Sequence, residues 1–128
     1  MNRLNQKQRW TIARLAYWYL DRGRPTEAER LTRGLIALDG SDGLAWQYYG
    51  EARRQQDDLE GAVNAFREAA KLRGDSAEVW TKLGAGLLQL HRRDPARQAL
   101  QRARGCVGDD DRLARRIDAL LRACTPAG

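Results

Sequence analysis

Apolar residues recur along the chain at helical spacing, in segments of helix length separated by short polar turns. The last segment shows the pattern most clearly, because Leu113, Ile117, Leu120, Leu121 and Cys124 lie at offsets that place them on one face of a helix. Glycine, proline and aspartate mark the turns, at 22–25, 39–42, 56–58, 75–76 and 91–95. This alternation predicts seven helices and no strands.

The same residue types also return at a fixed interval of 34 positions. The interval separates the members of four sets: Ala28, Ala62 and Ala96; Gly40, Gly74 and Gly108; Trp46 and Trp80; Gly50 and Gly84. A period of 34 is typical of the tetratricopeptide repeat, a helix–turn–helix unit that stacks on copies of itself. The chain therefore resembles tetratricopeptide-repeat proteins. The resemblance implies an all-α solenoid of three helix–turn–helix repeats and a C-terminal capping helix.

This register divides the chain into one repeat domain with short ends. The domain covers 9–124, with repeats at 9–42, 43–76 and 77–110 and the capping helix at 111–124, between tails at 1–8 and 125–128. Small residues of the pattern, including Gly50 and Gly84, are expected where two helices cross closely. The large ones are expected to fill the space between helices: Trp46, Phe66, Trp80 and Leu100.

The composition is that of one domain of 128 residues without a membrane span. No run of 18 apolar residues exists, and the first residues lack the apolar stretch of a signal peptide. We therefore expect a cytoplasmic protein. The two cysteines, Cys106 and Cys124, leave open a disulfide or a reduced buried pair, of which the reduced pair is favoured.

Arginine carries most of the formal net charge of +6. The densest basic segment covers 92–116 and contains Arg92, Arg93, Arg97, Arg102, Arg104, Arg112, Arg115 and Arg116. Such a segment is usually a solvated surface, and it can also bind nucleic acid or an acidic protein. Asp94 and the acidic residues 109–111 interrupt the segment, and no nucleic-acid motif accompanies it. We therefore favour an acidic protein partner over nucleic acid.

The side chains that could carry chemistry do not form a recognisable site. His91 is the single histidine and lies in a predicted turn, where no Ser/His/Asp or Cys/His set can be assembled around it. The cysteines lack the CxxC spacing of a zinc site, and no glycine-rich phosphate loop follows a strand. We predict a protein that is not an enzyme and has no cofactor and no metal site.

The repeat resemblance implies a binding groove on the concave face, lined by the first helix of each repeat. We expect the groove to hold an apolar segment of a protein partner. The candidate groove residues are Trp10, Arg14, Tyr17, Leu44, Gln47, Tyr48, Glu51, Lys82, Ala85 and Leu88. Repeat domains that clamp a C-terminal carboxylate carry lysine, arginine and asparagine at set positions of this groove. Lys82 is the only basic residue at those positions here, so we do not expect that clamp.

Four aromatic residues exceed what the repeat pattern requires: Trp10, Tyr17, Trp18 and Tyr48. Three of them fall on the predicted groove, where exposed aromatic side chains are typical binding anchors. The alternative is that they pack against neighbouring helices or the N-terminal tail. We expect Tyr48, in the middle repeat, to contribute to partner binding and little to stability. Trp18 falls on the open end of the first repeat, which indicates a homodimer or hetero-complex contact unless the tail covers it.

The stretch from Leu15 to Cys124 resembles the small chaperones of bacterial type III secretion. The resemblance rests on four segments in this order: LAYWYLDRGRPTEAERLTRGLIALD, LAWQYYGEARRQQDDLEGAVNAFREAAKL, VWTKLGAGLLQLHRRDPARQALQRA and DRLARRIDALLRAC. The spacing is similar to translocator chaperones of the LcrH/SycD type, and the short N-terminus is similar to the YscG and YscY types. The resemblance implies a cytoplasmic chaperone that holds a secretion substrate or apparatus subunit in its groove. The alternatives are an adaptor or scaffold in another assembly and a basic nucleic-acid-associated helical protein.

Overall fold

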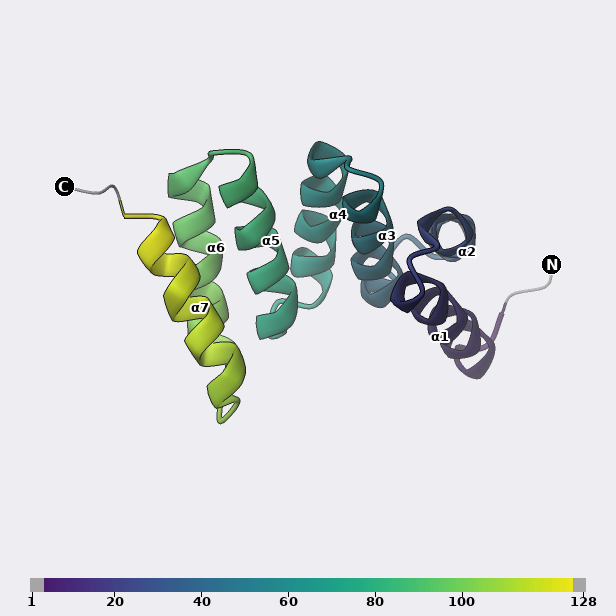
Figure 1. The fold of residues 1–128 in the computed structure, drawn as a ribbon. Helices are drawn as coiled ribbons and strands as arrows, with labels where there is room; N and C mark the ends of the chain where they lie inside the picture. The colour runs from purple at the N-terminus through teal and green to yellow at the C-terminus, as the bar shows by residue number, and fades with distance from the viewer. Residues whose placement is uncertain (1–3, 126–128) are drawn as a thin grey trace. The chain divides into compact units, whose positions relative to one another are not determined.

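The computed structural model describes residues 4–125, which form seven α-helices and no strands (Figure 1). The helices are α1 (Gln6–Asp21), α2 (Pro25–Leu38), α3 (Gly43–Gln55), α4 (Leu59–Leu72), α5 (Ala77–Gln89), α6 (Arg93–Cys106) and α7 (Asp111–Ala123). The predicted all-α class is confirmed. Within this described part, none of the helices combines the length and the apolar composition that crossing a membrane requires.

The helices fall into two compact units. The first unit, residues 1–72, contains α1 to α4, and the second, residues 73–128, contains α5 to α7. In the first unit α1 packs on α2 and α3, and α3 also packs on α2 and α4. In the second unit α5 packs on α6, and α7 lies along α6 and contacts α5 (Figure 1). The predicted domain boundaries stay a prediction.

Three helices begin at the same point of the repeat, because an N-cap residue recurs every 34 positions. Asp42, Ser76 and Asp110 each accept a hydrogen bond from the backbone N–H three residues later, at 3.1, 3.3 and 3.0 Å. The helices α3, α5 and α7 start at the residue after the cap. The repeat starts predicted at 43, 77 and 111 are therefore helix starts.

The first helix begins earlier than this register predicts. Asn5 caps α1 through a reciprocal pair, in which Asn5 Oδ1 accepts from the Gln8 N–H at 2.8 Å and Gln8 Oε1 accepts from the Asn5 N–H at 2.9 Å. Residues 6–8 therefore belong to α1, although we had assigned them to a tail. Farther along α1, Arg9 pairs with Asp39 at 2.8 Å. Hydrogen bonds from Ser41, together with Arg9, lower the pKa of Asp39 to about 2.

The turn inside each helix pair contains one residue in the left-handed conformation, always at the same position of the repeat. Gly23, Asp57 and His91 have φ values of 67°, 62° and 61°, and the sequence places them 34 residues apart. Glycine adopts this conformation without steric cost, whereas the Cβ atom of other residues makes it unfavourable. The repeat therefore fixes the backbone of this turn even where its residue is not glycine.

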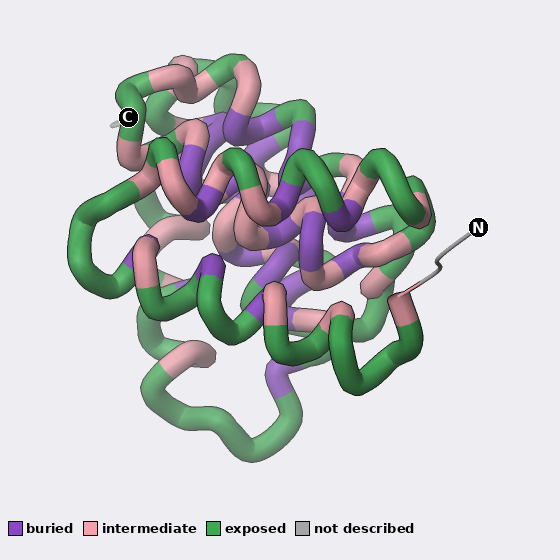
Figure 2. The backbone as a smooth tube through the Cα atoms, turned by 90° about the vertical axis from the view of Figure 1, so that its right-hand side faces the viewer, coloured by how far each residue is buried: buried purple, intermediate pink, exposed green. Residues whose placement is uncertain are grey.

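Two glycines allow the helices of a pair to approach closely, as predicted. A Cβ atom at Gly50 would lie 2.7 Å from the Phe66 ring, and one at Gly84 would lie 2.5 Å from Leu100 Cγ. Phe66 and Leu100 are fully buried, so each fills the space beside its glycine. Figure 2 shows such buried positions along the sides of the helices that face one another.

Trp46 and Trp80 differ from our expectation that they fill the space between helices, because both are only half-buried. The indole Nε1–H of Trp46 donates to the Gly40 carbonyl oxygen, and that of Trp80 donates to the Gly74 carbonyl oxygen, each at 2.8 Å. Each indole thus ties the start of its helix to the preceding turn. Tryptophan can do this because it combines an apolar ring with an N–H donor.

The two cysteines are reduced, as the sequence favours, but they do not form a buried pair. Both are free thiols, and Cys124 is fully buried whereas Cys106 is exposed at the end of α6. Burial raises the pKa of the Cys124 thiol, which suppresses the reactive thiolate. The two thiols therefore differ in accessibility.

We expect iodoacetamide to modify Cys106 in the native protein and Cys124 only after unfolding. Peptide mass spectrometry of samples labelled with and without denaturant measures the two sites separately. Equal labelling rates at both cysteines in the native protein would contradict the burial of Cys124.

Candidate partner-binding face

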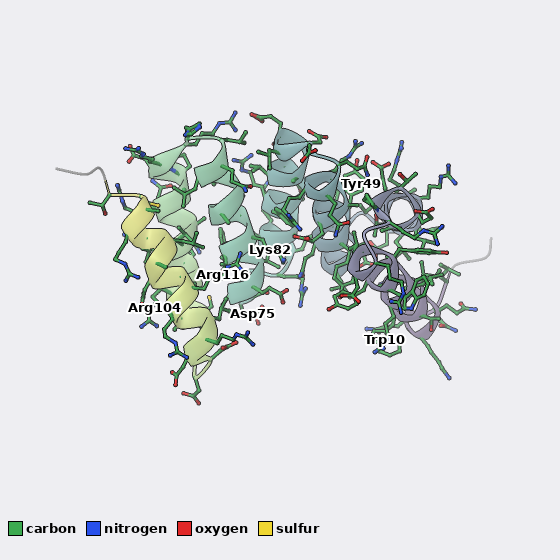
Figure 3. The ribbon with its side chains drawn as sticks, in the orientation of Figure 1. Trp10, Tyr49, Asp75, Lys82, Arg104 and Arg116 are labelled. Carbon is green, nitrogen blue, oxygen red and sulfur yellow. The ribbon has the colours of Figure 1, made fainter. Side chains whose placement is uncertain are left out.

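An exposed aromatic surface lies on α1 and reaches α3. Trp10 and Tyr17 are 55% and 56% exposed, which is high for large apolar side chains. The Tyr17 ring lies 5.7 Å from that of Tyr48 between centroids, at an interplanar angle of 46°. The Arg14 guanidinium carbon lies 4.8 Å from the Trp10 ring centroid, and Figure 3 shows Trp10 projecting from α1. We call Trp10, Arg14, Tyr17 and Tyr48 the aromatic face.

Trp10 and Tyr17 are thus exposed, and the alternative in which neighbouring helices cover them does not hold within the described residues. Tyr48 is different, because it is half-buried and packs against two groups of core residues. The first group is Ala16, Leu20, Ala28 and Ala52, and the second is Ala13, Leu35 and Ala45. Our expectation that Tyr48 contributes little to stability is therefore wrong, and Tyr17 is the better residue for a binding test.

The other candidates on α3 differ in accessibility. Leu44 is half-buried against the core, and Glu51 is half-buried and pairs with Arg54 at 2.8 Å. The hydrogen bond with Glu51 raises the pKa of Arg54. Gln47 is only 3% exposed, so it does not offer a contact surface and our assignment of it to the groove is corrected.

In the second unit, the candidates Lys82, Ala85 and Leu88 lie on α5 at offsets of three residues. All three are half-buried. That spacing places them along one side of the helix. Their role in partner binding stays a prediction.

A surface cavity of ≈ 640 Å³ lies over the exposed side of α1. Its lining residues are Thr11, Arg14, Leu15, Tyr17, Trp18, Tyr19, Asp21 and Arg22. Trp18 is 42% exposed, and the Arg22 guanidinium carbon lies 3.8 Å from its ring centroid. Of the tail that we expect to cover Trp18, Leu4 packs against a core group instead, Asn5 caps α1, residues 6–8 belong to α1, and residues 1–3 lie outside the described residues. The predicted contact with a second copy or a partner chain stays a prediction.

Several arginines of the basic segment 92–116 have partners within the chain. Arg97 donates to Asp94 at 3.1 Å and to the Cys124 carbonyl oxygen at 3.0 Å. Arg104 donates to Asp118 at 3.1 Å, and the Arg102 guanidinium carbon lies 5.2 Å from the Trp80 ring centroid. The Arg97–Asp94 pair has the i,i+3 spacing of a helix, whereas spacing along the sequence could not reveal the other three contacts, because each joins α6 to another helix or to the end of α7.

Outside these surfaces, the described residues offer no group of three or more His, Cys, Asp or Glu side chains that could hold a metal ion. His91 is exposed in the turn between α5 and α6. Glu29 Oε1 lies 3.0 Å from Arg53 Nε but accepts no aligned hydrogen bond, so the contact is an ion pair.

Comparison with solved structures gives matches over nearly the whole chain. The type III secretion translocator chaperone SycD of Yersinia enterocolitica matches with a TM-score of 0.88 at 18% identity, covering 94% of this chain and 86% of that chain. SycD in complex with a peptide of the translocator YopD matches with a TM-score of 0.86 at 18% identity, covering 96% of both chains. PcrH, a protein of Pseudomonas aeruginosa, in complex with the chaperone binding region of PopD matches with a TM-score of 0.87 at 22% identity, covering 97% of this chain and 96% of that chain.

In addition, residues 44–86 match the family model of the tetratricopeptide repeat (TPR). The chain has a TPR fold. No curated protein sequence matches it. In the TPR register, α1, α3 and α5 are the first helices of three repeats. Because α7 starts 34 residues after α5, it has the register of the first helix of a further repeat.

Proposed function

We propose that this TPR protein is a cytoplasmic, non-enzymatic chaperone of type III secretion. It holds an apolar segment of a secretion substrate or apparatus subunit on the predicted groove positions of its first helices. The observation that carries the proposal is the aromatic face of α1 and α3. The fold supports it as well, because the matching structures include SycD with a YopD peptide and PcrH with the chaperone binding region of PopD.

The aromatic face has the properties of a binding anchor. Trp10 and Tyr17 expose apolar rings that gain free energy when a partner covers them, at about 25 cal/mol per Å² of apolar surface. The Tyr48 ring contacts the Tyr17 ring, and Tyr48 itself packs against the core. Such pre-organised aromatic side chains contribute most of the binding energy in many interfaces.

The positive charges at the predicted groove positions favour a partner segment with acidic residues beside its apolar ones. Arg14 lies over Trp10, so a carboxylate of the partner could pair with its guanidinium group while the indole is covered. Lys82 adds a positive charge at a groove position of α5. A carboxylate-rich flank would therefore increase the rate of association and the specificity more than the affinity.

The proposal is tested with the double variant Trp10→Ala/Tyr17→Ala. Tagged wild-type chain is first purified from its native cells, and its partner, identified by mass spectrometry, should be a type III secretion substrate or apparatus subunit. Calorimetry with that purified partner should then show about 30-fold weaker binding for the variant, which corresponds to about 2 kcal/mol. Thermal unfolding of the variant should be nearly unchanged, because both side chains are exposed.

The matched control is Leu38→Ala/Leu72→Ala, which also removes two exposed large apolar side chains but from α2 and α4. We expect the control to bind like the wild type. Unchanged binding of Trp10→Ala/Tyr17→Ala would show that the aromatic face is not the anchor. If the purified partner belongs to an assembly other than type III secretion, the alternative function of a general TPR adaptor would be favoured.

A further inference from the structure

The capping helix α7 carries an arginine-rich surface on the side opposite its core contacts. Ile117 and Cys124 are fully buried, whereas Arg112, Arg115, Arg116 and Arg122 are exposed. At 100° per residue, these four arginines lie within one arc of the helix, and that arc is opposite Ile117. We call Arg112, Arg115, Arg116 and Arg122 the arginine face.

The arginine face has no carboxylate partner among the described residues, unlike the arginines of α6. The acidic residues of α7 are Asp111 in its first turn and Asp118, and Asp118 pairs with Arg104 of α6 at 3.1 Å. Figure 3 shows Arg104 and Arg116 at opposite edges of α7, with Arg116 at the edge next to α5. The Arg104–Asp118 ion pair therefore lies at the edge of α7 away from Arg116.

This arrangement does not stabilise the helix that carries it. Arg112 is three residues before Arg115 and four before Arg116, and like charges at these spacings repel each other. The first turns of a helix also disfavour positive charge, because the macrodipole is positive there. Arg122 lies in the last turn, where the macrodipole favours positive charge. The repulsion among Arg112, Arg115 and Arg116 has no such compensation, and binding of a negatively charged partner would relieve it.

The register of the repeat adds a second reason to expect a binding surface. Arg112 and Arg116 occupy the positions of α7 that correspond to Glu78 and Lys82 of α5, 34 residues earlier. The position of Lys82 and Arg116 is one of the groove positions predicted for the repeats. Both helices belong to the same unit, and α7 contacts α5. The basic surface of α7 is therefore continuous with a predicted groove position of α5.

We propose that the arginine face binds an acidic segment of a protein partner. Arg112 and Arg122 are separated by ten residues, a rise of about 15 Å along the helix, which matches about five residues of an extended chain. Each guanidinium group can bind a carboxylate through two parallel hydrogen bonds. A segment with glutamate or aspartate at alternate positions fits this spacing. The site lies wholly on the second unit and does not require the aromatic face.

A nucleic acid is the other polyanion that such a surface could attract, and the observations favour the acidic peptide. Single-stranded nucleic acid is usually held by aromatic side chains interleaved with basic ones. The exposed side of α7 contains alanine between its arginines and no aromatic residue.

Fluorescence anisotropy with a labelled peptide of six glutamates tests the proposal, at about 50 mM salt where charge attraction is weakly screened. The variant Arg112→Gln/Arg115→Gln/Arg116→Gln should bind about tenfold more weakly than the wild type. The control Arg30→Gln/Arg33→Gln/Arg67→Gln removes the same charge from exposed positions of α2 and α4 and should change the affinity by less than about twofold. Equal loss in both variants would overturn the proposal, because net charge alone would then explain binding.

A labelled oligothymidylate distinguishes the two classes of polyanion. Tighter binding of this probe than of the glutamate peptide, abolished by the α7 variant, would overturn the proposal in favour of nucleic acid. The Trp10→Ala/Tyr17→Ala variant should bind the glutamate peptide like the wild type. Loss of peptide binding in that variant would place the site on the first unit. If the arginine face does not bind the glutamate peptide, the proposed chaperone function is unaffected, because it rests on the aromatic face.

Discussion

Replacing Phe66 by alanine is expected to lower the free energy of unfolding by about 3–5 kcal/mol. The Phe66 side chain is fully buried, and its ring occupies the space that the missing Cβ atom of Gly50 leaves open. Neither helix can close this space, because α3 is also packed on α1 and α2. The substitution therefore creates a cavity in the first unit. Such a loss is a large part of the 5–15 kcal/mol that stabilises a typical domain.

Chemical denaturation of wild-type and Phe66→Ala protein measures this loss. The matched control is Leu72→Ala, which shortens an exposed apolar side chain on the same helix and should cost well under 1 kcal/mol. A difference below about 1 kcal/mol between Phe66→Ala and the wild type would mean that α3 and α4 pack differently. Binding assays on Phe66→Ala would not be informative, because α3 also carries Tyr48.

Replacing Ile117 by alanine is expected to cost about 2–5 kcal/mol in the same assay. Ile117 is the fully buried residue at the centre of α7, and the helix is otherwise held by contacts along α6 and a smaller contact with α5. Loss of its side chain weakens the attachment of the cap, so the apolar sides of α5 and α6 become accessible to water. We therefore also expect binding of a hydrophobic dye to increase.

Arg112→Ala is the control for this second prediction, since it shortens an exposed side chain of α7 and adds no cavity. Its stability should equal that of the wild type or exceed it slightly, because the repulsion of Arg112 by Arg115 and by Arg116 is removed. Equal destabilisation by Ile117→Ala and Arg112→Ala would show that α7 does not use Ile117 as its packing contact.

The fold was predictable from the sequence because one unit is repeated. An N-cap at Asp42, Ser76 and Asp110 fixes three helix starts, and the 34-residue interval repeats the same local structure at each. The repeat register failed where a local signal departs from it. The capping pair of Asn5 and Gln8 extends α1 beyond the start that the other repeats indicate.

The candidate site could be predicted only in part, because accessibility depends on neighbours that the repeat register does not describe. The register places Tyr17 and Gln47 alike on the groove, yet Tyr17 is 56% exposed and Gln47 is 3% exposed. Likewise, the sequence shows a dense run of arginines without showing that Arg104 is paired across helices and Arg116 is not. Such distinctions require the packing of the helices.

The left-handed residues of the intra-pair turns have a consequence for how easily this scaffold can be altered. Asp57 and His91 occupy a conformation that Gly23 adopts without steric cost. Glycine at either position would relieve backbone strain of about 1 kcal/mol, and the greater flexibility of glycine in the unfolded chain offsets part of this gain. Changes that create new binding properties usually destabilise a protein. Glycine at these two turns would offset that loss without touching the aromatic face or the arginine face. The chain therefore contains a stability reserve that protein engineers could use to retarget it to other partners.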